Sequence, residues 1–186
     1  RQVGKTYAIL EFGHTYYDNV AYFNFQTSET IAATFDENIS PSYLLPILSH
    51  ISGQTITIGN TLIVFDEIQL CERAVASLKY FCEEAPEYHV VAAGSLLGVA
   101  VNREKFVFPV GRVDRYTMYP MDIEEFLLAL GEKDLVERIH TCFDHNSPMP
   151  LALHEAGHQL YRQYRAIGGM PEVVARFIDT QDYIQV

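Results

Sequence analysis

The residues at the start of the chain have the types and spacing that phosphate binding requires. Gly4, Lys5 and Thr6 open a segment whose apolar residues recur with a helical period. They match the end of the phosphate-loop motif G-x-x-x-x-G-K-[ST], whose first glycine would lie before Arg1. In such a loop the backbone amides and the lysine contact the phosphates, and the Thr6 hydroxyl would ligate Mg²⁺. A chance Gly-Lys-Thr remains the alternative for this segment taken alone. The predicted nucleotide-binding residues are Gln2, Val3, Gly4, Lys5 and Thr6, and Lys5 is also predicted to be catalytic.

Two adjacent carboxylates follow a short apolar segment further along the chain. Residues 62–65 are all apolar, which is typical of a central parallel strand, and Asp66 and Glu67 come directly after them. Phosphoryl transfer uses one carboxylate to hold Mg²⁺ and another to polarise the attacking water. Asp66 is therefore predicted to hold the metal and Glu67 to act as the catalytic base. An ordinary solvated strand end is the alternative, but its coincidence with Gly-Lys-Thr favours a nucleotide-hydrolysing site.

A third polar residue closes another apolar segment. Residues 88–93 are predicted to form a buried strand, and Gly94 and Ser95 follow it. A hydroxyl at the carboxyl end of a neighbouring strand could hydrogen-bond the phosphate or the attacking water, so Ser95 joins the predicted catalytic residues. A plain Gly-Ser turn is the alternative. The three segments form one site only if the amino end of the first helix lies beside the strand that ends at Asp66.

The elements that would position these residues alternate between helix and strand, which is typical of an α/β domain. Pro120 marks a change to helices, and Asp122 with Glu125 predicts a capping box there. We therefore predict an α/β core over residues 1–119 and a helical part over 120–186. The predicted strands are 19–25, 61–65, 88–93 and 113–119, and the predicted helices are 4–12, 28–35, 42–51, 72–84, 123–130, 133–143, 151–165 and 171–178.

The composition excludes several classes of protein. The chain has 13 Lys and Arg against 24 Asp and Glu, a formal net charge of −11, which disfavours sequence-independent binding to nucleic acid and to anionic membranes. Its three cysteines form no C-x-x-C pair, so we expect neither a disulfide framework nor a zinc ribbon, and a cytoplasmic location fits. The longest apolar stretch is about a dozen residues, short of the ~20 that cross a bilayer.

Several stretches together resemble the AAA-type P-loop ATPases of bacteria and archaea, in the branch allied to origin-recognition and STAND ATPases. They run from Arg1 to Val174 and read R-Q-V-G-K-T, L-I-V-F-D-E-I-Q, A-A-G-S-L-L-G, F-P-V-G-R-V, Y-P-M-D-I-E-E-F-L and Y-R-A-I-G-G-M-P-E-V-V. The resemblance implies a three-layer α/β/α parallel sheet with strand order 5-1-4-3-2, its first strand upstream of Arg1, followed by a small helical, winged-helix-like segment. It also implies ATP and Mg²⁺ as cofactors and an attached C-terminal nuclease-like domain of unknown function.

The resemblance assigns a further cation to the site. Arg112 lies in F-P-V-G-R-V, where the family carries Lys or Arg, and it would reach the γ-phosphate within its own subunit or from a neighbour. The second arrangement would require a homo-oligomer. A surface arginine on a loop is the alternative.

These observations predict Mg²⁺-dependent ATP hydrolysis that is coupled to movement of the helical segment and of the attached domain. A slow nucleotide-gated switch would use the same residues. A zinc metalloprotease is a minor alternative, because His154, Glu155 and His158 form H-E-x-x-H. Arg162 and Arg165 continue the same helical face and would repel Zn²⁺, which argues against it.

Overall fold

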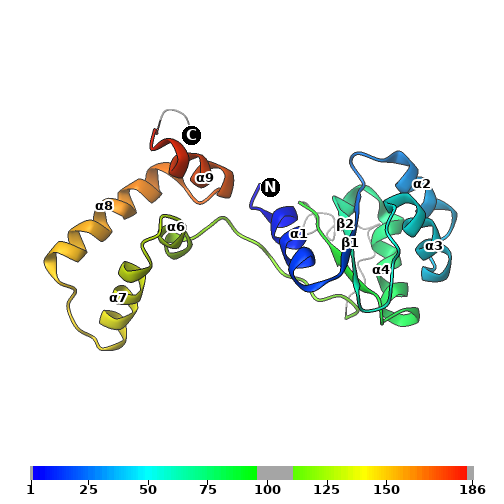
Figure 1. The fold of residues 1–186 in the computed structure, drawn as a ribbon, viewed down its shortest axis with the longest axis horizontal. Coiled ribbons are helices and arrows are strands. Elements are labelled where there is room, and N and C mark those ends of the chain that lie inside the picture. The colour runs from blue at the N-terminus through cyan, green and yellow to red at the C-terminus, as the bar shows by residue number, and fades with distance from the viewer. Residues whose placement is uncertain (1, 96–110, 184–186) are drawn as a thin grey trace. The chain divides into compact units, whose positions relative to one another are not determined.

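The computed structural model describes residues 2–95 and 111–183, which form two compact units. One, here called the sheet unit, comprises Lys5–Tyr116. The other, the helical unit, comprises Thr117–Val186 together with Arg1–Gly4. Figure 1 shows the strands in the first unit and helices throughout the second. In the ranges described, no helix is both long enough and apolar enough to cross a bilayer.

Parallel strands form the centre of the sheet unit. Within the described residues the sheet has three strands, β1 (Asn19–Asn24), β2 (Thr61–Asp66) and β3 (His89–Ala92), in the order β1-β2-β3. Both neighbouring pairs are parallel. All six residues of β2 are buried, as expected for a strand that is covered on both faces. The predicted mixed α/β fold with a parallel sheet is therefore confirmed.

Helices cover both faces of this sheet. In Figure 1 the strands lie between α1 (Lys5–Tyr16) and a group formed by the other helices of the unit. On the side of that group, Phe65 of β2 packs at the centre of an aromatic cluster, with ring centroids 5.5 Å from Phe35 and 5.9 Å from Phe23. The group comprises α2 (Glu29–Glu37), α3 (Pro41–Ser52) and α4 (Glu72–Glu84), and a short 3₁₀ helix, η1 (Ile68–Leu70), precedes α4.

The close approach of α1 to the sheet depends on a glycine. A Cβ on Gly13 would lie 2.6 Å from Cγ2 of Val20 and 3.1 Å from Cδ2 of Leu62. Contacts of that length are shorter than carbon atoms tolerate, so a larger residue would push α1 away from β1 and β2. Gly13 thereby fixes how near the last turns of α1 lie to the starts of β1 and β2.

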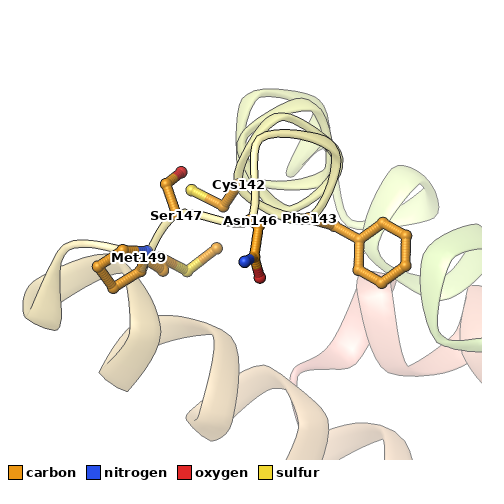
Figure 2. A pocket seen from close by; sticks show the side chains of 6 residues that line it. Cys142, Phe143, Asn146, Ser147 and Met149 are labelled. Carbon is orange, nitrogen blue, oxygen red and sulfur yellow. The ribbon is translucent and has the colours of Figure 1, made fainter.

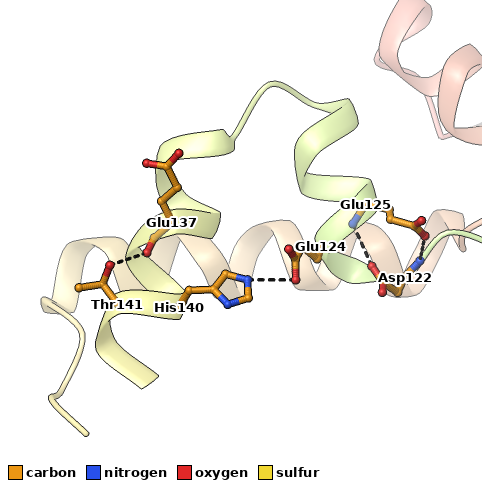
Figure 3. A network of polar contacts seen from close by, with 6 residues as sticks. All are labelled: Asp122, Glu124, Glu125, Glu137, His140 and Thr141. Carbon is orange, nitrogen blue, oxygen red and sulfur yellow. Dashed lines mark hydrogen bonds and ion pairs between the residues drawn. The ribbon is translucent and has the colours of Figure 1, made fainter. Parts of the chain in front are cut away.

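The helical unit contains α6 (Ile123–Ala129), α7 (Lys133–Asp144), α8 (Leu151–Ile167) and α9 (Pro171–Thr180). The predicted capping box is confirmed (Figure 3), because Oδ1 of Asp122 accepts from the amide of Glu125 at 2.9 Å and Oε2 of Glu125 accepts from the amide of Asp122 at 3.0 Å. Glu124 of α6 also pairs with His140 of α7 at 3.1 Å. A small apolar core joins these helices and contains Leu127, Leu135, Val136, Ile123, Met149 and Leu160.

The predicted strand at 113–119 is wrong. Residues 114–122 have no regular secondary structure, and Tyr116 and Tyr119 are largely exposed. A strand needs a neighbouring strand to satisfy its backbone hydrogen bonds. In the predicted order, the partner of this segment would be the first strand of the sheet. Among the described residues, this segment pairs with none of the three strands.

A second glycine, Gly169, allows two segments of the helical unit to come into close contact. The amide of Met121 donates to the carbonyl of Gly169 at 2.7 Å, and the Tyr164 hydroxyl donates to the carbonyl of Met121 at 3.0 Å. A Cβ on Gly169 would lie 2.0 Å from that Met121 oxygen. Backbone atoms must move to relieve such an overlap. A residue without a side chain is therefore required at position 169 for this close approach.

We expect Gly169→Ala to destabilise the protein by about 1–3 kcal/mol, the usual cost of overpacking. Urea unfolding followed by far-ultraviolet circular dichroism would measure the loss. Gly157→Ala is the matched control, because a Cβ on Gly157 of α8 meets nothing within 4 Å. That control should stabilise the helix by up to about 1 kcal/mol. Equal unfolding midpoints for Gly169→Ala and the wild type would contradict the prediction.

Candidate functional site

A hydrogen bond joins the start of α1 to the end of β2. Thr6 is the second residue of α1 and Asp66 is the last residue of β2. The Oγ1 of Thr6 donates to Oδ2 of Asp66 at 2.9 Å, although the two residues are 60 positions apart. Asp66 is only 5% exposed, so its carboxylate depends on protein donors for much of its hydrogen bonding. The amino end of the first helix and the carboxyl end of the Asp66 strand therefore lie side by side.

Asp66 receives two further hydrogen bonds. The Tyr22 hydroxyl donates to the same Oδ2 at 2.7 Å, and the amide of Glu67 donates to Oδ1 at 2.9 Å. Tyr22 in turn accepts a hydrogen bond, because Nδ2 of Asn24 donates to the Tyr22 oxygen at 3.2 Å. Burial raises the pKa of the Tyr22 phenol, and the hydrogen bond to Asp66 raises it further. The phenol consequently stays protonated and remains a donor at neutral pH.

Glu67 is held in an unusual conformation beside Asp66. Its backbone has φ of 52°, in the left-handed region that residues other than glycine seldom adopt. Its side chain accepts from two sources, the Nε2 of Gln69 at one oxygen and the Oγ of Ser95 at 3.3 Å at the other. Ser95 comes close because the amide of Ala93 donates to the carbonyl of Phe65 at 2.8 Å, which continues the β2–β3 pairing. The structure thus brings Ser95 to Glu67.

The oxygen atoms around Asp66 suit a magnesium ion. Because the Thr6 hydroxyl donates its hydrogen to Asp66, the lone pairs of its oxygen remain available to a cation. Mg²⁺ takes oxygen ligands, and in nucleotide sites one or two protein groups hold it together with phosphate and water. Thr6 and Asp66 would be the protein groups here. Among the residues described there is no cluster of three or more His, Cys, Asp or Glu side chains that could hold a metal by itself.

A comparison with protein families agrees with this geometry. The model of a family described as an AAA domain matches residues 1–127, more than half of the chain. The chain belongs to the AAA domain family. Membership suggests nucleotide-binding ATPase activity, and the matched part contains Lys5, Thr6, Asp66 and Glu67. No match was found among curated proteins or among solved structures.

The residues of the AAA domain that precede Lys5 belong to a different unit from Lys5, Thr6, Asp66 and Glu67. The division between the two units falls between Gly4 and Lys5, so Gln2, Val3 and Gly4 belong to the helical unit. Gly4 has φ of 83° and Gln2 has φ of 58°, both in the left-handed region. At Gly4 this conformation is one that glycine adopts at little cost.

Arg112 of the AAA domain does not lie beside Thr6 and Asp66. Its Nη2 pairs with Oε1 of Glu83 at 3.1 Å, in the last turn of α4. The chain passes from α4 to the beginning of β3, and the carbonyl of Glu87 there accepts from the amide of Gly59, just before β2. This pair is therefore at the amino-terminal edge of the sheet, whereas Asp66 ends β2 at the carboxyl-terminal edge. The role of Arg112 stays a prediction.

The histidines of H-E-x-x-H lie on α8, outside the matched range of the AAA domain. The rings of His154 and His158 contact each other with centroids 4.6 Å apart. No third metal ligand joins them in the described parts of the chain.

An open pocket adjoins the connection between α7 and α8 (Figure 2), but its lining offers a single thiol as a titratable group. The lining residues are Cys142, Phe143, Asn146, Ser147, Pro148 and Met149.

Two residues of the site, Tyr22 and Gln69, are not among those that the sequence predicts. Residues 19–25 are predicted to form a strand, and the alternation of Ala21, Phe23 and Phe25 places Tyr22 on the opposite face. That alternation was the available signal for Tyr22. The signal for Gln69 was its position three residues after Asp66, within the stretch L-I-V-F-D-E-I-Q.

Proposed function

We propose that this AAA domain binds Mg·ATP through Gln2, Val3, Gly4, Lys5 and Thr6 and hydrolyses it with Asp66 and Glu67. The single observation that supports this most is the hydrogen bond from Thr6 to Asp66, since a phosphate-binding helix start and a metal-holding carboxylate have to meet. Under this proposal β1, β2 and β3 are strands 2, 3 and 4 of the order 5-1-4-3-2, with which the observed order β1-β2-β3 is compatible.

Each residue has a separate part in the proposed reaction. The amides at the start of α1 and the Lys5 ammonium would hold the phosphates. Thr6 and Asp66 would orient the metal, and Mg²⁺ when bound would neutralise charge on the phosphate oxygens. Glu67 would take a proton from the attacking water, which lowers the barrier by making the water a better nucleophile. Ser95, hydrogen-bonded to Glu67, would keep that carboxylate in place or contact the phosphate.

Arg112 would bring a further cation to the γ-phosphate, within its own subunit or from a neighbouring copy of the chain. Its pairing with Glu83, at the other edge of the sheet from Asp66, favours the neighbouring copy. We propose that nucleotide state is passed on to the helical unit and to an attached C-terminal domain. The slow-switch alternative shares all of these residues, and only a turnover rate separates the two. No observation favours the zinc protease.

Nucleotide binding to the full-length protein tests the proposal. Calorimetric titration with ATP should show binding that tightens when Mg²⁺ is added. Lys5→Ala should weaken the affinity by about 10- to 100-fold, because a charge-assisted hydrogen bond contributes about 1.5–3 kcal/mol. Lys79→Ala is the matched control, since Lys79 is an exposed lysine on α4. Equal affinity for ATP in wild type and Lys5→Ala would overturn the proposal.

A further inference from the structure

Tyr22 lies on the same face of the sheet as Asp66. In the parallel register Asn24 is opposite Asp66 and Tyr22 is opposite Val64, two residues before Asp66. Side chains two positions apart along a strand point to the same side, so Tyr22, Asn24 and Asp66 share one face. Phe23 and Phe65 point to the other face, into the aromatic cluster. The pairing of β1 with β2 therefore brings the Tyr22 hydroxyl to the Asp66 carboxylate.

The hydrogen bonds on this face run in one direction. The amide of Gln26 donates to Oδ1 of Asn24 at 2.8 Å, which fixes the orientation of the Asn24 amide group. Nδ2 of Asn24 then donates to the Tyr22 oxygen, and the Tyr22 hydroxyl donates to Oδ2 of Asp66. Asn24 leaves the Tyr22 hydrogen free to point at Asp66 because it occupies a lone pair of the phenol oxygen. Each member of this series therefore favours the hydrogen bond made by the next.

Two hydroxyl groups donate hydrogen bonds to Oδ2 of Asp66, and their roles differ. Thr6 donates to it at 2.9 Å and Tyr22 at 2.7 Å. The lone pairs of Thr6 are free for a cation, whereas the Tyr22 oxygen is already engaged by Asn24. Tyr22 is thus suited to hold the carboxylate rather than to bind metal itself. Groups that hold a metal-binding carboxylate in place affect metal affinity, and their loss typically costs 10- to 100-fold.

From these contacts we infer that Tyr22 is a positioning residue that orients Asp66 toward the metal ion of Mg·ATP, an inference that rests on the proposed function. Tyr22 acts through Asp66 and touches neither nucleotide nor metal. Among the described residues, its loss leaves the buried Oδ2 with Thr6 as its one remaining side-chain donor. The carboxylate is then held less firmly, by Thr6 at Oδ2 and by the amide of Glu67 at Oδ1, and Thr6 has a less fixed acceptor.

The test compares Tyr22→Phe with wild type in the full-length protein, with Mn²⁺ as a paramagnetic probe in place of Mg²⁺. Electron paramagnetic resonance titrations in the presence of ATP should show Mn²⁺ affinity lowered by about 10- to 100-fold. ATP affinity measured without a divalent cation should be unchanged. Tyr17→Phe is the matched control, because the Tyr17 hydroxyl instead meets Nδ1 of His89 at 2.9 Å. Wild-type Mn²⁺ affinity in Tyr22→Phe would overturn the inference.

A double-mutant comparison separates positioning from a general effect on folding. If Tyr22 acts through Asp66, Tyr22→Phe should change Mn²⁺ affinity little when Asp66→Asn is already present. Additive losses would overturn the inference, as would an equal loss of metal-free ATP binding. Different results would refute the proposed function and the role of Tyr22. Absence of ATP and Mn²⁺ binding in the wild type itself would refute the proposed function, whereas normal wild-type binding that is unaffected by Tyr22→Phe would refute only the role of Tyr22.

Discussion

Glu67→Gln should leave ATP bound and lower its hydrolysis by about 10²- to 10⁴-fold, the usual contribution of a positioned general base. The amide has the shape of the carboxylate but cannot take a proton from water. The fold should tolerate the change, because Gln69 can turn its own amide to match. Among the described residues no donor reaches the buried Oε1 of Gln69, which could then accept from the new NH₂ group. Single-turnover release of phosphate measures the rate.

The matched control for this experiment is Glu72→Gln, which changes an exposed glutamate in the first turn of α4. It should hydrolyse ATP at the wild-type rate. Equal rates for Glu67→Gln and wild type would show that Glu67 is not the base. If wild-type turnover were itself very slow and Glu67→Gln changed it little, the nucleotide-gated switch would replace the ATPase as the best account of the chain.

Asp66→Asn should remove the gain in ATP affinity that Mg²⁺ provides, while metal-free ATP binds as before. The substitution keeps the shape of the side chain, and the hydroxyl groups of Thr6 and Tyr22 can rotate to accept from the new NH₂ group. It deletes the negative charge that attracts the cation, and we expect at least a tenfold loss, about 1.4 kcal/mol. Calorimetric titration with ATP, with Mg²⁺ and with EDTA, measures the difference.

Asp66→Ala is the useful comparison, because it tests structure as well as charge. It leaves the Thr6 hydroxyl, the Tyr22 hydroxyl and the Glu67 amide without their acceptor. A buried donor without a partner costs about 1–3 kcal/mol, so Asp66→Ala should unfold at lower urea than Asp66→Asn. Mg²⁺-enhanced ATP binding that survives in Asp66→Asn would contradict the metal role of Asp66.

The sequence predicted the parts of the site that follow from strong local patterns. The apolar segment before Asp66 is typical of a buried strand, and the structure has one there. A helix is predicted to begin at Gly4, and in the structure it begins at Lys5. The capping box at Asp122 needs only residues that are close in sequence. Such features are fixed by short-range chemistry, so they can be recognised without knowledge of the tertiary structure.

The features that were missed or wrong depend on neighbours that are distant in sequence. Tyr22 reaches Asp66 through the register between β1 and β2, which no local pattern specifies. Gln69 reaches Glu67 through a turn that forces a non-glycine residue into the left-handed region. Residues 113–119 have the composition of a strand, but a strand also needs a partner. The pairing of Arg112 with Glu83 likewise depends on where α4 ends.

One face of β1 and β2 contributes the aromatic cluster, and the other face contributes the residues of the proposed site. Phe23 and Phe65 alternate with Tyr22 and Asp66, so cohesion of the fold and chemistry of the site use different side chains of the same strands. A change on the polar face can therefore retune metal or nucleotide affinity without opening a cavity in the apolar layer. Variants that keep the shape of Tyr22 or Asp66 can change the activity of the domain while the aromatic cluster, and its contribution to folding stability, is preserved.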